Sequence, residues 1–159
     1  MKSKVSFGLV ALSVLVLVDS GRAAGQTISQ EAPVLVEALA KQLVARKRTK
    51  VAAVDFTDIQ GRPNELGRFL ADQLSIDMVM AEGLTVIDRA NLNAIMAEHK
   101  LTAEGLVDPA NAKKLGQFSG VEAILVGNLT TMDGAVMLTV RAISTDTSEL
   151  VAAGRMRVA

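Results

Sequence analysis

The chain has 159 residues, half of them hydrophobic, with 17 basic and 17 acidic side chains and no cysteine. Because the charges balance, no field of one sign would draw the protein to nucleic acid or to an anionic lipid surface. The lack of cysteine excludes disulfide bonds, thiol chemistry and a lipid-modified N-terminal cysteine. The fold must therefore be stabilised by packing.

The first 25 residues have the pattern of a secretory signal peptide. Two lysines precede an apolar run over residues 5–18, which is too short to cross a bilayer, and small residues follow it. We assign residues 1–25 to the signal peptide, with cleavage after Ala23 or Gly25; an uncleaved membrane anchor is the alternative. The protein is then expected in the periplasm or at the outer membrane, and not as a lipoprotein.

Removal of the signal peptide leaves a chain of the size of one ordinary domain, about 135 residues. It takes away three basic residues and one acidic residue, which leaves 14 basic and 16 acidic side chains and a net charge of −2. We expect one domain over residues 50–159, preceded by an amphipathic helical segment over residues 26–49.

That segment has apolar residues at the spacing of a helix, from about residue 31 to residue 46. Pro33 suits the first turn of such a helix, and basic residues 46–48 suit its C-terminal end. The apolar positions are Val34, Leu35, Leu39, Leu43 and Val44.

The next part of the chain alternates between strands and helices. Residues 50–57 and 84–87 are short apolar runs typical of buried strands. Between them, a helical pattern begins at Asn64 and extends to about Ala81, with Gly83 as its C-terminal cap. The glycine at position 67 inside this helix predicts a close backbone approach to the sheet.

Two further helices and three strands complete the chain. Asp88 and Asp108 are expected to cap helices that end near residues 99 and 118. Strands are expected over residues 121–130, 136–143 and 149–158, the first two joined by a hairpin at Asp133-Gly134. The order of elements predicts the α/β class: a single three-layer domain with a mixed sheet, in which helices are followed by a C-terminal antiparallel meander and the first two strands are parallel.

Several separated segments resemble the FlgO domain and the related CsgG-type family of bacterial envelope proteins. The resemblance covers roughly residues 50–153. It rests on VAAVDFTDIQG (51–61), ELGRFLA (65–71), VIDRANL (86–92), EHKL (98–101), GLVDPANAKKLG (105–116) and VEAILVG (121–127).

The resemblance implies an α/β domain similar to the N-terminal domain of TolB and to the penicillin-binding-protein activator LpoB. It further implies a role without enzymatic activity in flagellar, curli-like or cell-wall assembly. A secretion pore of the curli type is not expected, because the chain has no cysteine for lipidation and no additional alternating segments for a barrel.

Four polar residues are candidates for a ligand site at the ends of the first two strands: Asp55, Asp58, Asp88 and Arg89. Ligands often bind at strand ends in open α/β sheets. The structural alternative is that Asp58 fixes a loop, that Asp88 caps a helix and that Arg89 pairs with Glu65 or Asp72. No catalytic residue, metal ligand set or cofactor is predicted, since the chain has one histidine and no phosphate-binding loop.

Two functions of different classes follow. In the first, the protein binds other envelope proteins through the leading helix and the free edge of the final hairpin. In the second, it is a small-ligand or peptidoglycan-synthesis regulator with a site at the strand ends. A homo-oligomer and a peripheral contact with the outer membrane stay open, and no nucleic-acid partner is expected.

Overall fold

The computed structural model describes residues 20–102 and 104–158, so most of the predicted signal peptide lies outside the described residues. The described residues form four α-helices, one 3-10 helix and six strands. In chain order these are α1 (Ser20–Ala45), β1 (Lys50–Ala53), β2 (Thr57–Asp58), α2 (Glu65–Val79), β3 (Thr85–Val86), α3 (Arg89–Glu98), η1 (Glu104–Val107), α4 (Pro109–Ser119), β4 (Ala123–Met132), β5 (Ala135–Ser144) and β6 (Leu150–Arg157).

The strands form one mixed sheet in the order β3-β1-β4-β5-β6, and β2 continues beside β4 where β1 has ended. β1 runs parallel to β3 and β4, whereas β4, β5 and β6 are antiparallel. The predicted parallel pairing of the first two strands and the C-terminal meander are thus confirmed.

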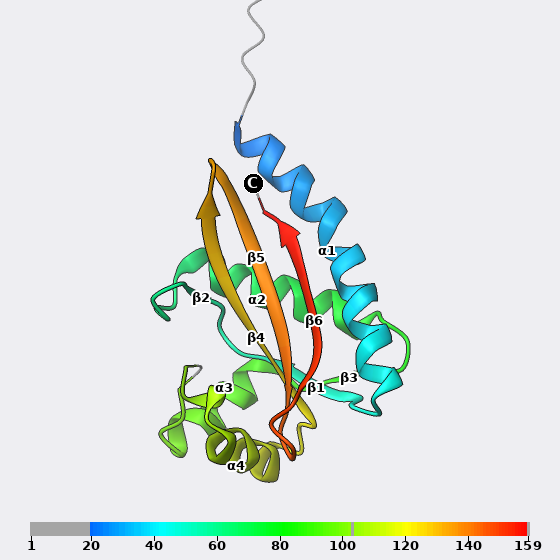
Figure 1. The fold of residues 1–159 in the computed structure, drawn as a ribbon, viewed down its shortest axis with the longest axis vertical. Coiled ribbons are helices and arrows are strands. Elements are labelled where there is room, and N and C mark those ends of the chain that lie inside the picture. Colours follow the sequence, from blue (N-terminus) through cyan, green and yellow to red (C-terminus); the bar gives the residue numbers. More distant parts are fainter. Residues whose placement is uncertain (1–19, 103, 159) are drawn as a thin grey trace, which may run out of the picture.

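Helices lie on both faces of this sheet, which confirms the predicted α/β class and its layers (Figure 1). α1 and α2 pack on one face, against Val51, Leu125 and Leu138 among others. α3 and α4 pack on the opposite face, against Ala52, Ile124 and Val126. Side chains alternate between the two cores along each central strand because successive residues of a strand point to opposite faces.

Helix α1 begins earlier than predicted. Pro33 lies inside it and not in its first turn, so the predicted start near residue 31 is wrong. A proline in a helix interior costs about 3 kcal/mol. The apolar residues next to Pro33 offset this cost because they are buried against the sheet, as are those further along α1: Ala32, Leu35, Val36, Leu39 and Leu43.

The side chains of α1 also close the outer edge of β6. The amide of Gln42 donates from Nε2 to the carbonyl of Ala153 at 3.0 Å and accepts from the N–H of the same residue at 3.2 Å. The Glu31 carboxylate accepts from the backbone N–H of Arg157 at 2.6 Å. The expectation that the final hairpin offers a free edge is therefore wrong at these positions, because polar side chains of α1 take the place of a neighbouring strand.

The predicted strand over residues 50–57 is divided into β1 and β2 by Phe56, which is fully buried. Its ring lies over Gly127, where an added Cβ would come within 2.5 Å of ring carbons. Its carbonyl oxygen lies where a Cβ on Gly67 would be, at 2.1 Å. The close approach predicted for Gly67 is confirmed.

Most helix ends follow the predicted capping residues. The side chains of Asp88 and Asp108 cap α3 and α4, and Gly120 ends α4 in the left-handed conformation. The exception is Gly83, which was predicted to cap α2. The helix ends at Val79 with Met80 as its C-cap, and Gly83 lies in the following turn with a φ of 81°.

Candidate functional site

Asp55 and Arg89 are brought together by the fold, between the end of β1 and the start of α3. Arg89 Nη1 lies 2.8 Å from Asp55 Oδ1, and Arg89 Nε lies 2.7 Å from Asp72 Oδ1 on α2. The N–H bonds are not aimed at the carboxylate oxygens, so these are ionic contacts and not directed hydrogen bonds. Arg89 thus links the loop after β1 with α2 and α3. The Asp72 contact agrees with the structural alternative, and the Asp55 contact was not predicted.

Asp58 is occupied by its own turn. Its Oδ1 accepts from the backbone N–H groups of Gln60 and Arg62, both at 2.9 Å. Its Oδ2 accepts from Arg62 Nε, also at 2.9 Å. The hydrogen bond from the backbone of Arg62 is the largest of the contacts that hold the pKa of Asp58 below its usual value. The contacts that surround this carboxylate are those of a structural turn residue.

Asp88 has a structural role as well, because its Oδ2 accepts from the N–H of Asn91 at 3.0 Å and so caps α3. Each of the three predicted aspartates therefore has its own partners. Of the four candidate residues, Asp55 and Arg89 are the two whose side chains form an ion pair with each other.

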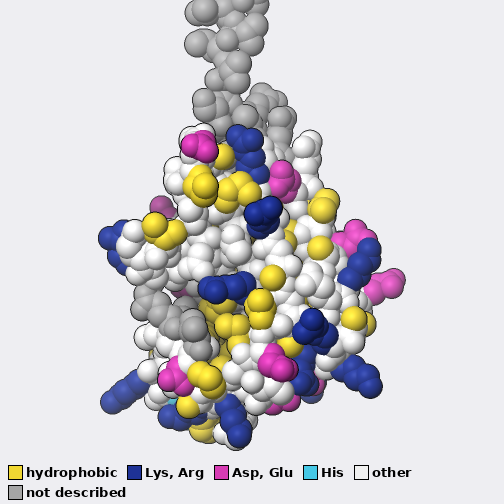
Figure 2. Space-filling view, viewed as in Figure 1, with side chains coloured by type: hydrophobic (Ala, Val, Ile, Leu, Met, Phe, Trp, Pro, Cys, Tyr) yellow, Lys and Arg dark blue, Asp and Glu magenta, His cyan; other side chains and the backbone are white. Residues whose placement is uncertain are grey.

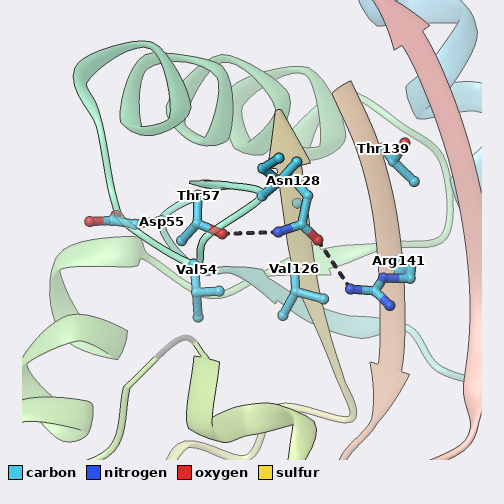
Figure 3. Close-up of a pocket in the computed structure, with 10 residues that line it drawn as sticks. Val54, Asp55, Thr57, Val126, Asn128, Thr139 and Arg141 are labelled. Carbon is cyan, nitrogen blue, oxygen red and sulfur yellow. Dashed lines mark hydrogen bonds between the residues drawn. The ribbon is translucent and has the colours of Figure 1, made fainter. Parts of the chain in front are cut away.

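A hollow of about 550 Å³ lies beside these residues, between the loop after β1 and the strands β4 and β5. Figure 3 shows that Thr57, Asn128 and Arg141 form a row of hydrogen-bonded side chains along it. Arg141 Nη2 donates to Asn128 Oδ1 at 3.1 Å, and Asn128 Nδ2 donates to Thr57 Oγ1 at 3.0 Å. The row holds the guanidinium of Arg141 at the mouth of the hollow, where it can bind an anionic group.

The sequence contained a signal for this row that the prediction did not use. The turn at Asp133-Gly134 fixes the register of the hairpin, and that register places Asn128 opposite Thr139 and Val126 opposite Arg141. Paired residues of a hairpin share a face, so Asn128 and Arg141 were predictable neighbours. Thr57 was not predictable as their partner, because Thr57 on β2 and Asn128 on β4 are 71 residues apart in the sequence.

The part of the chain that the structure describes lacks the features of a metal centre or a membrane-spanning helix. No group of three or more potential metal ligands occurs among these residues. His99, the one histidine, ends α3 and stacks on the ring of Phe118 with 3.8 Å between ring centroids. Among residues 20–102 and 104–158, no helix has the length and hydropathy needed to cross a membrane.

Comparison with known proteins places this fold in a family. The family model described as FlgO protein matches residues 32–159. The chain belongs to the FlgO family. The match begins inside α1 and so includes the second half of that helix as well as the sheet. No curated protein matches the sequence.

Solved structures of LpoB share the fold of this FlgO protein. The LpoB C-terminal domain from Escherichia coli is 12% identical with a TM-score of 0.59, over 81% of this chain and 98% of that one. The domain from Salmonella enterica is 17% identical with a TM-score of 0.57, over 77% and 93%. At these identities the likeness concerns the fold alone. The predicted relation to CsgG-type and TolB-like proteins stays a prediction.

Proposed function

We propose that this FlgO protein is a non-enzymatic assembly factor of the bacterial envelope, exported to the periplasm or outer membrane, which acts by binding other envelope proteins. Membership of the FlgO family and the fold shared with LpoB support this proposal. The main observation in its favour is that the predicted site residues already have partners within the chain. Asp55, Asp58, Asp88 and Arg89 all form ion pairs or hydrogen bonds with other residues of the fold.

These contacts also argue against the simplest enzymatic role for the same residues. A general acid needs a carboxyl group that is protonated near neutral pH. The lowered pKa of Asp58 keeps that group ionised, and the guanidinium of Arg89 lies against Asp55.

Fractionation of cells followed by crosslinking tests the proposal. We expect the processed protein in the periplasmic or outer-membrane fraction, in adducts with a defined set of envelope proteins. Cells that express a version without residues 1–25 provide the control, since that version should stay in the cytosol without the same adducts. A full-length protein that remains cytosolic, or one that yields no envelope adduct, would contradict the proposal.

A second candidate function, that of a small-ligand or peptidoglycan-synthesis regulator with a site at the strand ends, is favoured by the hollow beside Arg141. Separate substitutions of Asp55, Asp58 and Asp88 distinguish the two functions. Loss of function with an unchanged melting temperature would favour a ligand site at the strand ends. Loss of folding would instead agree with the contacts described above.

A further inference from the structure

The far halves of β4, β5 and β6 extend beyond α3 and α4 and leave one face of the sheet uncovered (Figure 1). We call this surface the open face. This is the side of the sheet against which α3 and α4 pack at the other end of the strands. The residues of the open face are paired across the strands: Asn128, Thr130, Met132, Ala135, Met137, Thr139, Arg141, Ala153, Arg155 and Arg157.

The open face is basic, whereas the chain as a whole is neutral. Three of its residues are arginines and none is acidic. Figure 2 looks onto this side of the molecule and shows dark blue side chains near the middle of the view, among white and yellow surface. At the edge of this face, the Glu31 carboxylate of α1 accepts from the backbone N–H of Arg157. The strands β5 and β6, which carry Arg141 and Arg155, contain no acidic residue.

Two of the arginines are available for a partner. Arg155 is exposed, and its side chain has no hydrogen bond or ion pair with residues 20–102 or 104–158. Arg141 is exposed and held by Asn128, which leaves the rest of its guanidinium free to bind. A guanidinium held in one orientation loses less entropy when it binds a carboxylate in a bidentate manner. Arg141 and Arg155 are near neighbours on adjacent strands, because Arg155 pairs with Thr139.

The composition of the open face fits a protein partner better than a polyanion or a lipid surface. Arginine and methionine are enriched in protein interfaces, and Met132 and Met137 accompany the arginines here. Lipid surfaces and nucleic acids attract proteins through an excess of positive charge, which this neutral chain does not have. At Ala153 of β6, Gln42 takes the place of an added strand, which favours a partner that uses the face of the sheet over one that pairs with this edge.

We propose that the open face docks an acidic surface segment of another envelope protein, with a carboxylate bound by Arg141 at the mouth of the hollow. The proposal rests on the proposed function and adds to it the location of the interface and the chemistry of the partner.

A second exposed surface provides the comparison. Along α2, apolar side chains lie at the spacing of one helical stripe, and they include Phe69, Ile76 and Met80, which are 52%, 59% and 83% exposed. Nothing in residues 20–102 and 104–158 indicates what would cover this stripe, so we assign it no binding partner. Because α2 packs on the opposite face of the sheet, it serves as an independent position in the test.

The test is photo-crosslinking in living cells with the full chain, using a photoreactive amino acid at Thr139 on the open face or at Val79 on α2. We expect Thr139 to give an adduct with an envelope protein. Adducts from Val79 but not from Thr139 would overturn the inference while the proposed function stands. The absence of protein adducts from both positions would overturn both.

Affinity measurements with the purified crosslinked partner test the chemistry. We expect Arg141→Glu and Arg155→Glu each to weaken binding about tenfold or more, since loss of a hydrogen-bonded charge pair has effects of at least this size. Arg68→Glu on α2 makes the same change of net charge away from the open face and should leave the affinity within about twofold. Equal effects of all three variants would contradict the inference.

Two further measurements cover the remaining outcomes. If Arg141→Glu lowers the melting temperature, Thr139→Glu provides the same test, because it places a negative charge beside Arg155 without removing the contact to Asn128. Vesicles of phosphatidylglycerol test the lipid alternative. The inference would be overturned in favour of a lipid surface by two results together. The arginine variants would lose binding to these vesicles, and their affinity for the protein partner would be unchanged.

Discussion

The contacts of Arg89 allow a direct test of whether Asp55 is a structural residue or a site residue. We compare Asp55→Ala with Asp72→Ala, which remove the two carboxylates that contact the same guanidinium. The side chain of Arg89 is 13% exposed, that of Asp55 is 27% exposed and that of Asp72 is 60% exposed. Both variants remove one ionic contact of about the same length, so exposure is the main difference between them.

The exposed contact should contribute little to stability. Solvent screens the Asp72 pair, and we expect Asp72→Ala to cost about 0.5 kcal/mol, as for other surface ion pairs. The contact between Asp55 and Arg89 is shielded, and loss of a buried partner leaves an uncompensated charge at a cost of 3–5 kcal/mol. Because Asp72 still neutralises part of that charge, we expect about 2–3 kcal/mol for Asp55→Ala and a melting temperature lower by about 10 °C.

Chemical denaturation and thermal unfolding measure these differences, and the double variant Asp55→Ala with Arg89→Met provides the control. Removal of both charges should cost less than the sum of the single changes, because no buried charge is left without a partner. Equal small losses for Asp55→Ala and Asp72→Ala would refute this reasoning. A stable Asp55→Ala variant that no longer functions would assign Asp55 to a ligand site.

Three other expectations concern the packing and the pH dependence of the fold. Gly67→Ala should lower stability by about 2–4 kcal/mol in denaturation, because its Cβ would overlap the carbonyl of Phe56; a gain of about 1 kcal/mol from helix propensity alone would contradict the structure. Glu122 accepts from the N–H groups that begin β1, which lowers its pKa below the ordinary 4.5. The ionised carboxylate of Glu122 stabilises the fold fully above pH 4.5, and this stabilisation is lost as the pH falls through the lower pKa of the folded state. Glu122→Gln should therefore reduce the loss of stability at acid pH, as measured by denaturation at a series of pH values. Gln42→Ala should cost about 1 kcal/mol and increase self-association in size-exclusion chromatography, because it uncovers the backbone of Ala153.

The parts of the fold that were predictable from sequence are those fixed by local chemistry. Asp88 and Asp108 cap their helices because a carboxylate accepts from backbone N–H groups two or three residues away. Asp133-Gly134 forms the hairpin because both residues adopt a positive φ, at 50° and 74°. Each of these features is formed by a few consecutive residues, so it could be predicted from a short segment of sequence.

The features that were missed depend on residues far apart in the chain. The break between β1 and β2 follows from the packing of Phe56 on Gly127, and the closed edge of β6 follows from Gln42 on α1. The early start of α1 was missed for a different reason. A proline is most often found in the first turn of a helix, but the buried stripe that surrounds Pro33 stabilises the helix on both sides of it.

The closed edge and the open face together limit how this protein can associate with others. An unpaired edge strand would bind any extended chain through its backbone, with little selectivity for side chains. With β6 occupied by Gln42 and Glu31, the outer strand of the meander is protected at these positions from unselective pairing. Recognition through the face of the sheet instead depends on the charge and shape of side chains, above all Arg141 and Arg155. In the envelope role proposed above, this arrangement gives selectivity among partly folded proteins, since a partner must present carboxylates that match the arginines and not merely a free strand.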